Sequence, residues 1–307
     1  MRPPAAPADA IVLPGVLEAL ATTKAMIGRS VASLSAADPG LFGPGTVSWR
    51  VFSHASYGAS GVAAALVQAL HPVAMAAVDR HSAFRRDAWR RAHMTADYVF
   101  TITFSARPVA EAAARKVRAI HSKLSGTEPA TGRFYRADDP DLLLWIHCVH
   151  TDYALRGYDA FASRLTPAEA DDFVREQVVA ARLVGLDGER VPRSRAELLA
   201  FLSSVEGLRA TGPALRFSRM LLDARMPLTM RPFWALHVAA AAALLPDDVR
   251  RTYALPRWLP RGRLARALMR AAFRAMNSGY LLFRPVRRAR ARLRQIERDL
   301  AHAPEPR

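Results

Sequence analysis

The stretch DPDLLLWIHCVHTDYAL, residues 139–155, decides the fold class of this 307-residue chain. Asp139 and Pro140 have the form of a helix start, because an aspartate at the N-cap accepts a free N–H group and a proline in the first turn has none to lose. The residues that follow are mostly apolar and lack the strict alternation that is typical of a half-buried strand. The stretch therefore predicts a helix.

Comparable start signals stand elsewhere in the chain. Thr166 with Glu169 and Ser194 with Glu197 match the capping box, in which the two side chains accept N–H groups from each other's backbone. A further helix is expected from Pro108 to residue 124, ended by the glycine at position 126. Helices are also expected at about residues 14–34, 58–70, 88–103, 206–224, 231–245 and 260–300. No segment alternates with period two, so we predict an all-α fold.

Composition indicates one large domain. The chain is 51% hydrophobic, which is enough for a sizeable core, and no repeat or Gly/Ser linker divides residues 45–255. We expect an N-terminal extension at residues 1–45, a single large helical domain at residues 46–255, and basic amphipathic helices at residues 256–307.

The net charge of +17 lies mainly at the C-terminal end, where residues 250–307 carry 16 arginines against three acidic residues. Leu264 and Leu268 share one side of an expected helix that arginines surround, a pattern typical of helices that lie on anionic membranes. Residues 284–298 suit non-specific binding of phosphates. The sequence predicts peripheral membrane contact through residues 260–298. The alternative is a solvated tail packed on the domain, and no motif indicates a specific nucleic-acid partner.

Cysteine content and apolar runs bear on the compartment. The single Cys148 excludes an intramolecular disulfide and a thiolate-rich metal cluster, and fits a reducing compartment. The first 20 residues have no continuous apolar core of a signal peptide, and the most apolar run, residues 234–245, is too short to span a bilayer. We expect a cytoplasmic protein that attaches peripherally at the inner membrane face.

His121 is the first candidate for chemistry. It lies on the apolar stripe of its expected helix, with Val117 one turn before it and Leu124 one turn after it. The opposite face carries Arg115, Arg118 and Ser122. A neutral imidazole on an apolar face suits the iron of a haem in a dry pocket. The alternative is a core histidine that bonds a backbone carbonyl.

Arg91 and Thr95 share one face of the preceding helix. A fixed cation and a hydroxyl that face an apolar cavity suit the binding of a haem propionate or the polarisation of dioxygen. The alternative is a surface arginine and a threonine bonded back to its own helix.

The remaining histidines allow several interpretations. His147 and His150 lie one turn apart and are candidate metal ligands, haem-pocket residues or packing residues, whereas His71 and His81 fit capping and turn roles as well as chemistry. No glutamate has a histidine three residues later, and HExxH, G-x-S-x-G and glycine-rich phosphate loops are missing. These patterns exclude the usual di-iron, zinc-protease and serine-hydrolase signatures, and favour a prosthetic group over a bare metal.

The order of these segments resembles a known family. ALHPVAMAAVDRHSAF (69–84), Arg91-x-x-x-Thr95, VRAIHSKLSG (117–126) and FYRADDPDLLLWIH (134–147) are similar, in succession and spacing, to the MpaB-type oxygenase and latex-clearing (rubber oxygenase) superfamily. LTPAEADDF (165–173) and LLPDDVRRTYAL (244–255) extend the resemblance, which covers about residues 48–255.

The resemblance implies a globin-like helical core that holds haem b. His121 corresponds to the proximal ligand of the iron, Arg91 and Thr95 to catalytic residues of the haem pocket, and His147 to a pocket-lining position. Members cleave carbon–carbon double bonds of polyisoprene or shorten a farnesyl chain with dioxygen. We therefore expect a haem-dependent oxygenase of a lipophilic substrate that contains an alkene or isoprenoid unit. The alternative is a non-catalytic helical protein that associates with anionic membranes through its C-terminal helices.

Some positions depart from the family pattern. Met94 stands where latex-clearing proteins have a lysine, Ser105 where relatives often have glycine, and Ile146 where a Trp-Val-His motif has valine. Members that act on rubber are exported, whereas no export signal is expected here. The resemblance thus implies a differently gated distal side and a substrate other than rubber.

Overall fold

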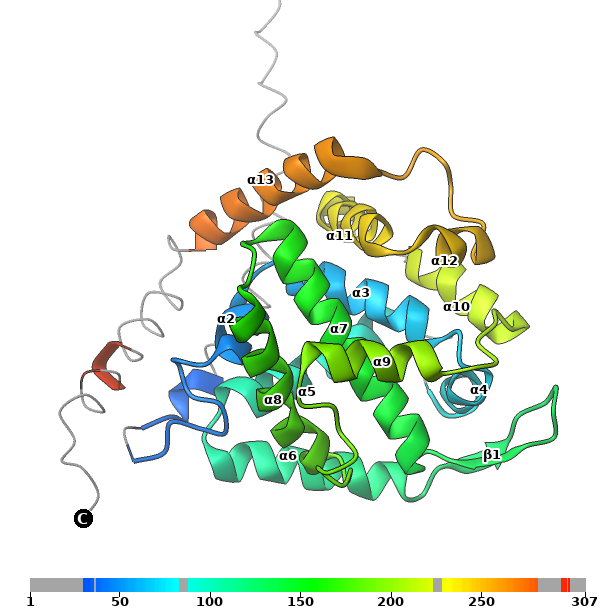
Figure 1. The fold of residues 1–307 in the computed structure, drawn as a ribbon, viewed down its shortest axis with the longest axis horizontal. Coiled ribbons are helices and arrows are strands. Elements are labelled where there is room, and N and C mark those ends of the chain that lie inside the picture. The colour runs from blue at the N-terminus through cyan, green and yellow to red at the C-terminus, as the bar shows by residue number, and fades with distance from the viewer. Residues whose placement is uncertain are drawn as a thin grey trace, which may run out of the picture.

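The structure is a computed structural model that describes residues 30–35, 37–82, 88–222, 228–280, 294–296 and 298, with backbone alone for 88–92, 229 and 278–280. Helices form nearly all of its regular structure, so the all-α prediction is confirmed (Figure 1). In chain order the elements are α2 (Val47–Ser53), α3 (Tyr57–Gln68), α4 (Pro72–His81), α5 (Ala88–Phe104), α6 (Arg107–His121), β1 (Ser125–Thr127), β2 (Phe134–Arg136), α7 (Pro140–Phe161), α8 (Pro167–Leu183), α9 (Arg195–Ser204), α10 (Gly212–Leu222), the 3₁₀ turn η3 (Leu228–Met230), α11 (Arg231–Leu244), α12 (Asp247–Thr252) and α13 (Gly262–Tyr280).

Helix α7 runs through the middle of the molecule (Figure 1). Asp139 accepts the N–H of Asp141 at 2.9 Å, so the predicted N-cap is confirmed, and the helix continues to Phe161. It packs along α3, and a Cβ added at Gly157 would stand 1.9 Å from the buried Ser60 Oγ. Glycine is favoured there because any side chain would meet the side chain of Ser60 on α3.

Helices α5 and α6 form a hairpin joined by residues 105 and 106. The Asp38 carboxylate accepts the N–H of Arg107 at 3.0 Å and so caps the start of α6 from a distant loop. The prediction that this helix reaches residue 124 was wrong, since α6 ends at His121. Gly126 does not cap it but pairs with Tyr135 in a short antiparallel hairpin, β1 with β2, which period-two patterning missed.

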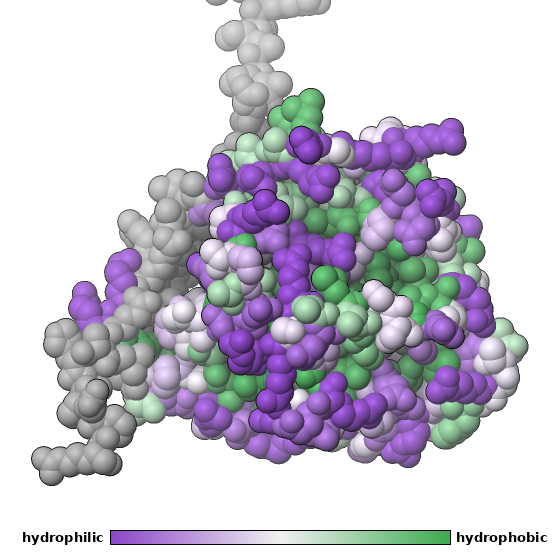
Figure 2. Space-filling model, in the orientation of Figure 1, coloured by the Kyte–Doolittle hydropathy of each residue, from purple (hydrophilic) through white to green (hydrophobic). Residues whose placement is uncertain are grey.

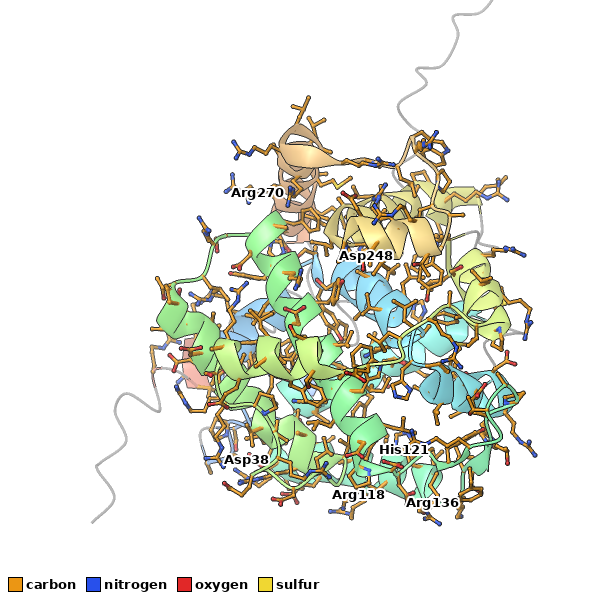
Figure 3. All side chains as sticks on the ribbon, turned by 45° about the vertical axis from the view of Figure 1, so that its right-hand side comes forward. Asp38, Arg118, His121, Arg136, Asp248 and Arg270 are labelled. Carbon is orange, nitrogen blue, oxygen red and sulfur yellow. The ribbon has the colours of Figure 1, made fainter. Side chains whose placement is uncertain are left out.

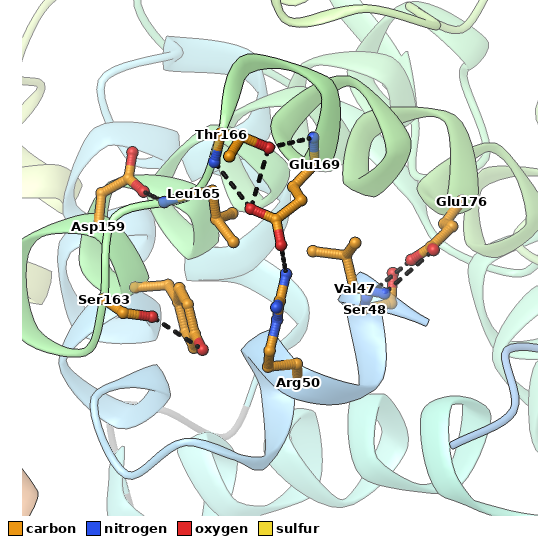
Figure 4. A network of polar contacts seen from close by, with 10 residues as sticks. Val47, Ser48, Arg50, Asp159, Ser163, Leu165, Thr166, Glu169 and Glu176 are labelled. Atoms are coloured by element: carbon orange, nitrogen blue, oxygen red, sulfur yellow. Dashed lines mark hydrogen bonds and ion pairs between the residues drawn. The ribbon is translucent and has the colours of Figure 1, made fainter. Parts of the chain in front are cut away.

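Carboxylates cap the first turns of α2 and α8, and one of these carboxylates also joins the two helices (Figure 4). Glu176 accepts the N–H groups of Val47 and Ser48 at 3.1 and 2.7 Å. Thr166 and Glu169 form the full predicted capping box, and Glu169 also pairs with Arg50 of α2 at 2.6 Å. These contacts hold α2 against α8.

The second expected capping box is only half formed. Ser194 accepts the N–H of Glu197 at 3.2 Å, but the Glu197 carboxylate accepts the N–H of Arg193, one residue before the cap. The Glu197 carboxylate therefore binds the N–H of Arg193 in place of the N–H of Ser194, which a full capping box would use.

Other helix limits differ from expectation at their ends. The helix expected at 206–224 begins at Gly212, because the chain before it follows the end of α3, with Arg209 N–H donating to Leu70 O at 2.8 Å. The helix expected at 231–245 is confirmed as α11. Most of the helix expected at 14–34, and residues 281–293 of the one expected at 260–300, lie outside the described residues.

Within the described ranges, no single helix is long and apolar enough to cross a bilayer; α3 and α4 meet the length and composition criteria only as a pair bent by 109°.

Candidate functional site

His121 is the last residue of α6, at the lower edge of the molecule close to Arg118 and Arg136 (Figure 3). It lies on the inner stripe of the helix, in line with the buried Ala110 and Ala114, and its Nδ1 atom is buried. The residues expected on the opposite face, Arg115, Arg118 and Ser122, are exposed. The His121 side chain as a whole is partly exposed, so its stripe is buried at Ala110 and Ala114 and reaches the surface at the end of the helix.

A carboxylate lies near this histidine. Asp138 forms a bidentate pair with Arg136, at 2.9 and 2.8 Å, and this pair lowers the pKa of Asp138. His121 contributes in the same direction, so its ring is within electrostatic reach of the carboxylate. The strand β2 and the start of α7 thus return the chain beside the end of α6.

The hairpin of α5 and α6 carries Arg91 and Thr95 to the same end as His121. At 1.5 Å per residue, Arg91 and His121 each stand about 20 Å from the turn between the helices. On the face of α5 that carries Thr95, Ile102 is buried, Tyr98 is partly buried and Thr95 is exposed. This face therefore passes from the core to the open end of the hairpin. The side chain of Arg91 is outside the described residues.

Met94, at the position where latex-clearing proteins have lysine, is 59% exposed. A thioether neither carries charge nor donates a proton, so this position contributes apolar surface at the open end of α5.

His147 and His150 lie in the second and third turns of α7, inside the fold. Burial lowers the pKa of His147 to about 3, with a further contribution from His150, and burial lowers the pKa of His150 to about 4. Both imidazoles are neutral at pH 7 and each has a nitrogen lone pair to offer.

The two histidines differ in their contacts. His150 Nε2 and the Tyr57 hydroxyl are hydrogen-bonded at 2.9 Å, and its ring stacks on Phe52 with centroids 5.7 Å apart. This is the environment of a packing histidine. His147 is partly accessible, as His150 is, and it shares neither the hydrogen bond to Tyr57 nor the stacking on Phe52.

Two phenol hydroxyls on separate elements are buried, and among the described residues neither has a hydrogen-bond partner. They belong to Tyr98 of α5 and Tyr135 of β2. Burial raises the pKa of Tyr98 to about 12, opposed by nearby Arg118. Buried polar atoms are normally satisfied, so each of these hydroxyls is a donor that a polar group of a ligand could use.

The two remaining candidates have structural roles. His71 caps α4 by accepting the N–H of Ala74 at 3.3 Å, and His81 Nε2 is hydrogen-bonded to Ser125 O of β1 at 2.9 Å. The capping interpretation of His71 is confirmed. Over the part of the chain that the structure describes, no group of three His, Cys, Asp or Glu side chains is arranged to hold a metal ion.

The sequence did not single out Tyr57 or Tyr135. Tyr57 meets His150 from 93 positions away, and Tyr135 approaches Gly126 only because a hairpin forms. No local pattern marks either contact.

Comparison with known proteins gives one match. The family described as "ER-bound oxygenase mpaB/B'/Rubber oxygenase, catalytic domain" matches residues 49–277, from α2 into α13. No curated protein and no solved structure matches the chain at a significant level. The globin-like core that the resemblance implied stays a prediction.

Proposed function

Because the chain belongs to the mpaB/rubber oxygenase catalytic family, we propose that it is a haem-dependent oxygenase of a lipophilic substrate with an alkene or isoprenoid unit. The observation that carries the haem assignment is His121, the family's ligand position, on the inner stripe of α6 with Nδ1 buried. A ligand turned toward solvent would not hold iron in a dry pocket.

Two buried tyrosines carry hydroxyls that suit the propionates of a haem. Tyr98 and Tyr135 have no partner for these hydroxyls among the described residues, and propionates are acceptors for such donors. His147 is neutral and keeps accessible surface.

The roles of the chain's own residues follow. His121 would hold the iron through its imidazole, and Asp138 lies near enough to help orient that ring. Thr95 and Arg91 would supply a hydroxyl and a cation to bound dioxygen or to a propionate. Met94 leaves the position of the family's lysine without a proton donor. When bound, haem supplies the activation of dioxygen, chemistry that side chains do not provide.

The substrate class follows from the family. The exposed Met94, at the position of the family's lysine, offers no charge to recognise a polar substrate. An alkene or isoprenoid chain would bind through apolar contact, and water would be excluded from the reacting double bond as the chain fills the site.

The test is the absorption spectrum of the full-length protein supplied with haem. We expect a Soret band and one haem per chain by the pyridine haemochrome method. His121→Ala should abolish the band, whereas His150→Ala should retain it. His81→Ala, an exposed histidine near the same end of the fold, is the matched control and should also retain the band. Folded protein with no Soret band, or an unchanged band in His121→Ala, would refute the proposal.

A further inference from the structure

Helix α13 lies along the upper rim of the molecule and carries two different apolar faces (Figure 1). On the inner face, Met269 and Phe273 are buried against α7 and α11, with the Phe273 ring 5.4 Å from Phe161. Arg270 donates to the carbonyls of Asp159 and Ala160 at 2.9–3.1 Å, at the end of α7. These contacts fix the rotation of α13 about its axis.

The outer face is apolar and exposed. Leu264 and Leu268 are 75% and 65% exposed, and Ala271 and Ala275 continue the same stripe and are exposed as well. Spacings of four, three and four residues place all four side chains on one side of the helix. Since the inner face is held by α7 and α11, the leucines cannot turn inward.

The turn before α13 adds a large aromatic side chain to this rim. Leu255 and Leu259 are buried, and the buried Arg250 donates to Leu259 O at 3.2 Å. Between these anchors Arg257 is exposed and Trp258 is 80% exposed. The turn that these anchors hold therefore presents the Trp258 side chain to solvent.

The charge around this apolar surface is of one sign. Arg257, Arg261 and Arg263 are exposed, and the sequence has no acidic residue between Asp248 and Glu297. Figure 2 shows hydrophobic side chains projecting at this rim beside hydrophilic ones. A basic border around exposed Trp and Leu complements anionic phospholipids, whose phosphates pair with arginine and whose acyl boundary accepts apolar side chains.

We propose that α13 and the preceding turn, residues 256–275, form a surface that docks on an anionic phospholipid bilayer. Trp258, Leu264 and Leu268 enter the boundary between headgroups and acyl chains, where tryptophan is favoured. The exposed arginines contact lipid phosphates. Docking brings the domain to the phase in which lipophilic molecules dissolve. These residues are distinct from those proposed to hold haem, so either proposal can fail without the other.

The test is co-sedimentation of the full-length protein with vesicles of phosphatidylcholine alone or of equal parts phosphatidylcholine and phosphatidylglycerol. We expect binding to the anionic vesicles that weakens as salt is added, because screening reduces attraction to the phosphates. Leu264→Ser/Leu268→Ser should weaken binding about tenfold or more, since both side chains leave the acyl boundary. Arg257→Gln/Arg263→Gln should weaken it about fivefold for each arginine.

The matched control lies on the β1–β2 hairpin, which projects from another part of the molecule (Figure 1). Arg133 is exposed there and Phe134 is 64% exposed, close to the exposure of Leu268. Arg133→Gln/Phe134→Ser should bind vesicles as the unchanged protein does. Circular dichroism should find all variants folded, because the substituted side chains are exposed.

Several results would overturn the proposal. They are absence of vesicle binding, equal binding to both vesicle types, unchanged binding in the two rim variants, or equal loss in the hairpin control. A dimer that Leu264→Ser/Leu268→Ser dissociates would assign the rim to contact between copies of the chain. Binding of single-stranded RNA without binding of vesicles would assign it to nucleic acid.

Discussion

Acidification should destabilise this protein through His147 and His150. In the folded protein burial lowers the pKa of these groups to about 3 and about 4, whereas an unfolded chain titrates near the ordinary value of 6.5. Between these values the unfolded state binds more protons than the folded state, so the free energy of unfolding falls as pH falls. Above about pH 7.5 neither state is appreciably protonated and the contribution is constant.

The magnitude follows from the two titrations. From pH 7 to pH 5, protonation of the unfolded chain costs the folded state about 2 kcal/mol for each histidine, or about 4 kcal/mol for the pair. Both rings keep some accessible surface, which reduces the burial effect, so these figures are upper values. A loss of this size is a large part of the 5–15 kcal/mol typical of a folded domain.

The assay is urea unfolding of the haem-free protein followed by circular dichroism at pH 7, 6 and 5. His147→Gln and His150→Gln remove one titrating group each. Both variants should start less stable at pH 7, but each should lose about 2 kcal/mol less than the parent between pH 7 and pH 5. Carboxylates titrate equally in all three proteins, so their effect cancels in the comparison. Parallel loss of stability in parent and variants would refute the reasoning.

Four further substitutions test contacts between helices, each by urea unfolding at pH 7. Tyr57→Phe removes the hydroxyl that bonds His150 and should destabilise the fold by about 1–3 kcal/mol, with an unchanged value contradicting the contact. Glu176→Ala removes the acceptor of two N–H groups at the start of α2 and should cost about 1–2 kcal/mol; no loss would mean that water replaces it fully. Gly157→Ala should cost about 1–3 kcal/mol because its Cβ meets the Ser60 side chain of α3. Gly61→Ala has open space around its Cβ and should stabilise the fold by about 0.4–1 kcal/mol. The reverse order of stability would contradict the packing.

Part of the candidate site could be predicted because it depends on helix periodicity. His121 lies on the inner stripe of α6 as its spacing from Val117 indicates, and Arg91 and Thr95 share a row on α5. Their convergence at one end of a hairpin required the turn at residues 105 and 106, whose direction no local pattern specifies.

The all-α class and most helix starts were determined by the sequence alone, because helix hydrogen bonds and caps join residues within four positions of each other. Asp139 and Thr166 act on the turns that follow them and could be read directly. Contacts between distant segments depended on tertiary structure. Asp38 caps α6 from 69 positions away, and Tyr57 bonds His150 from 93 positions away. Nothing near either residue encodes its partner, since packing of whole helices brings them together. The same holds for α13: its amphipathic pattern is local, but burial of Phe273 against α7 decided which face remains outside.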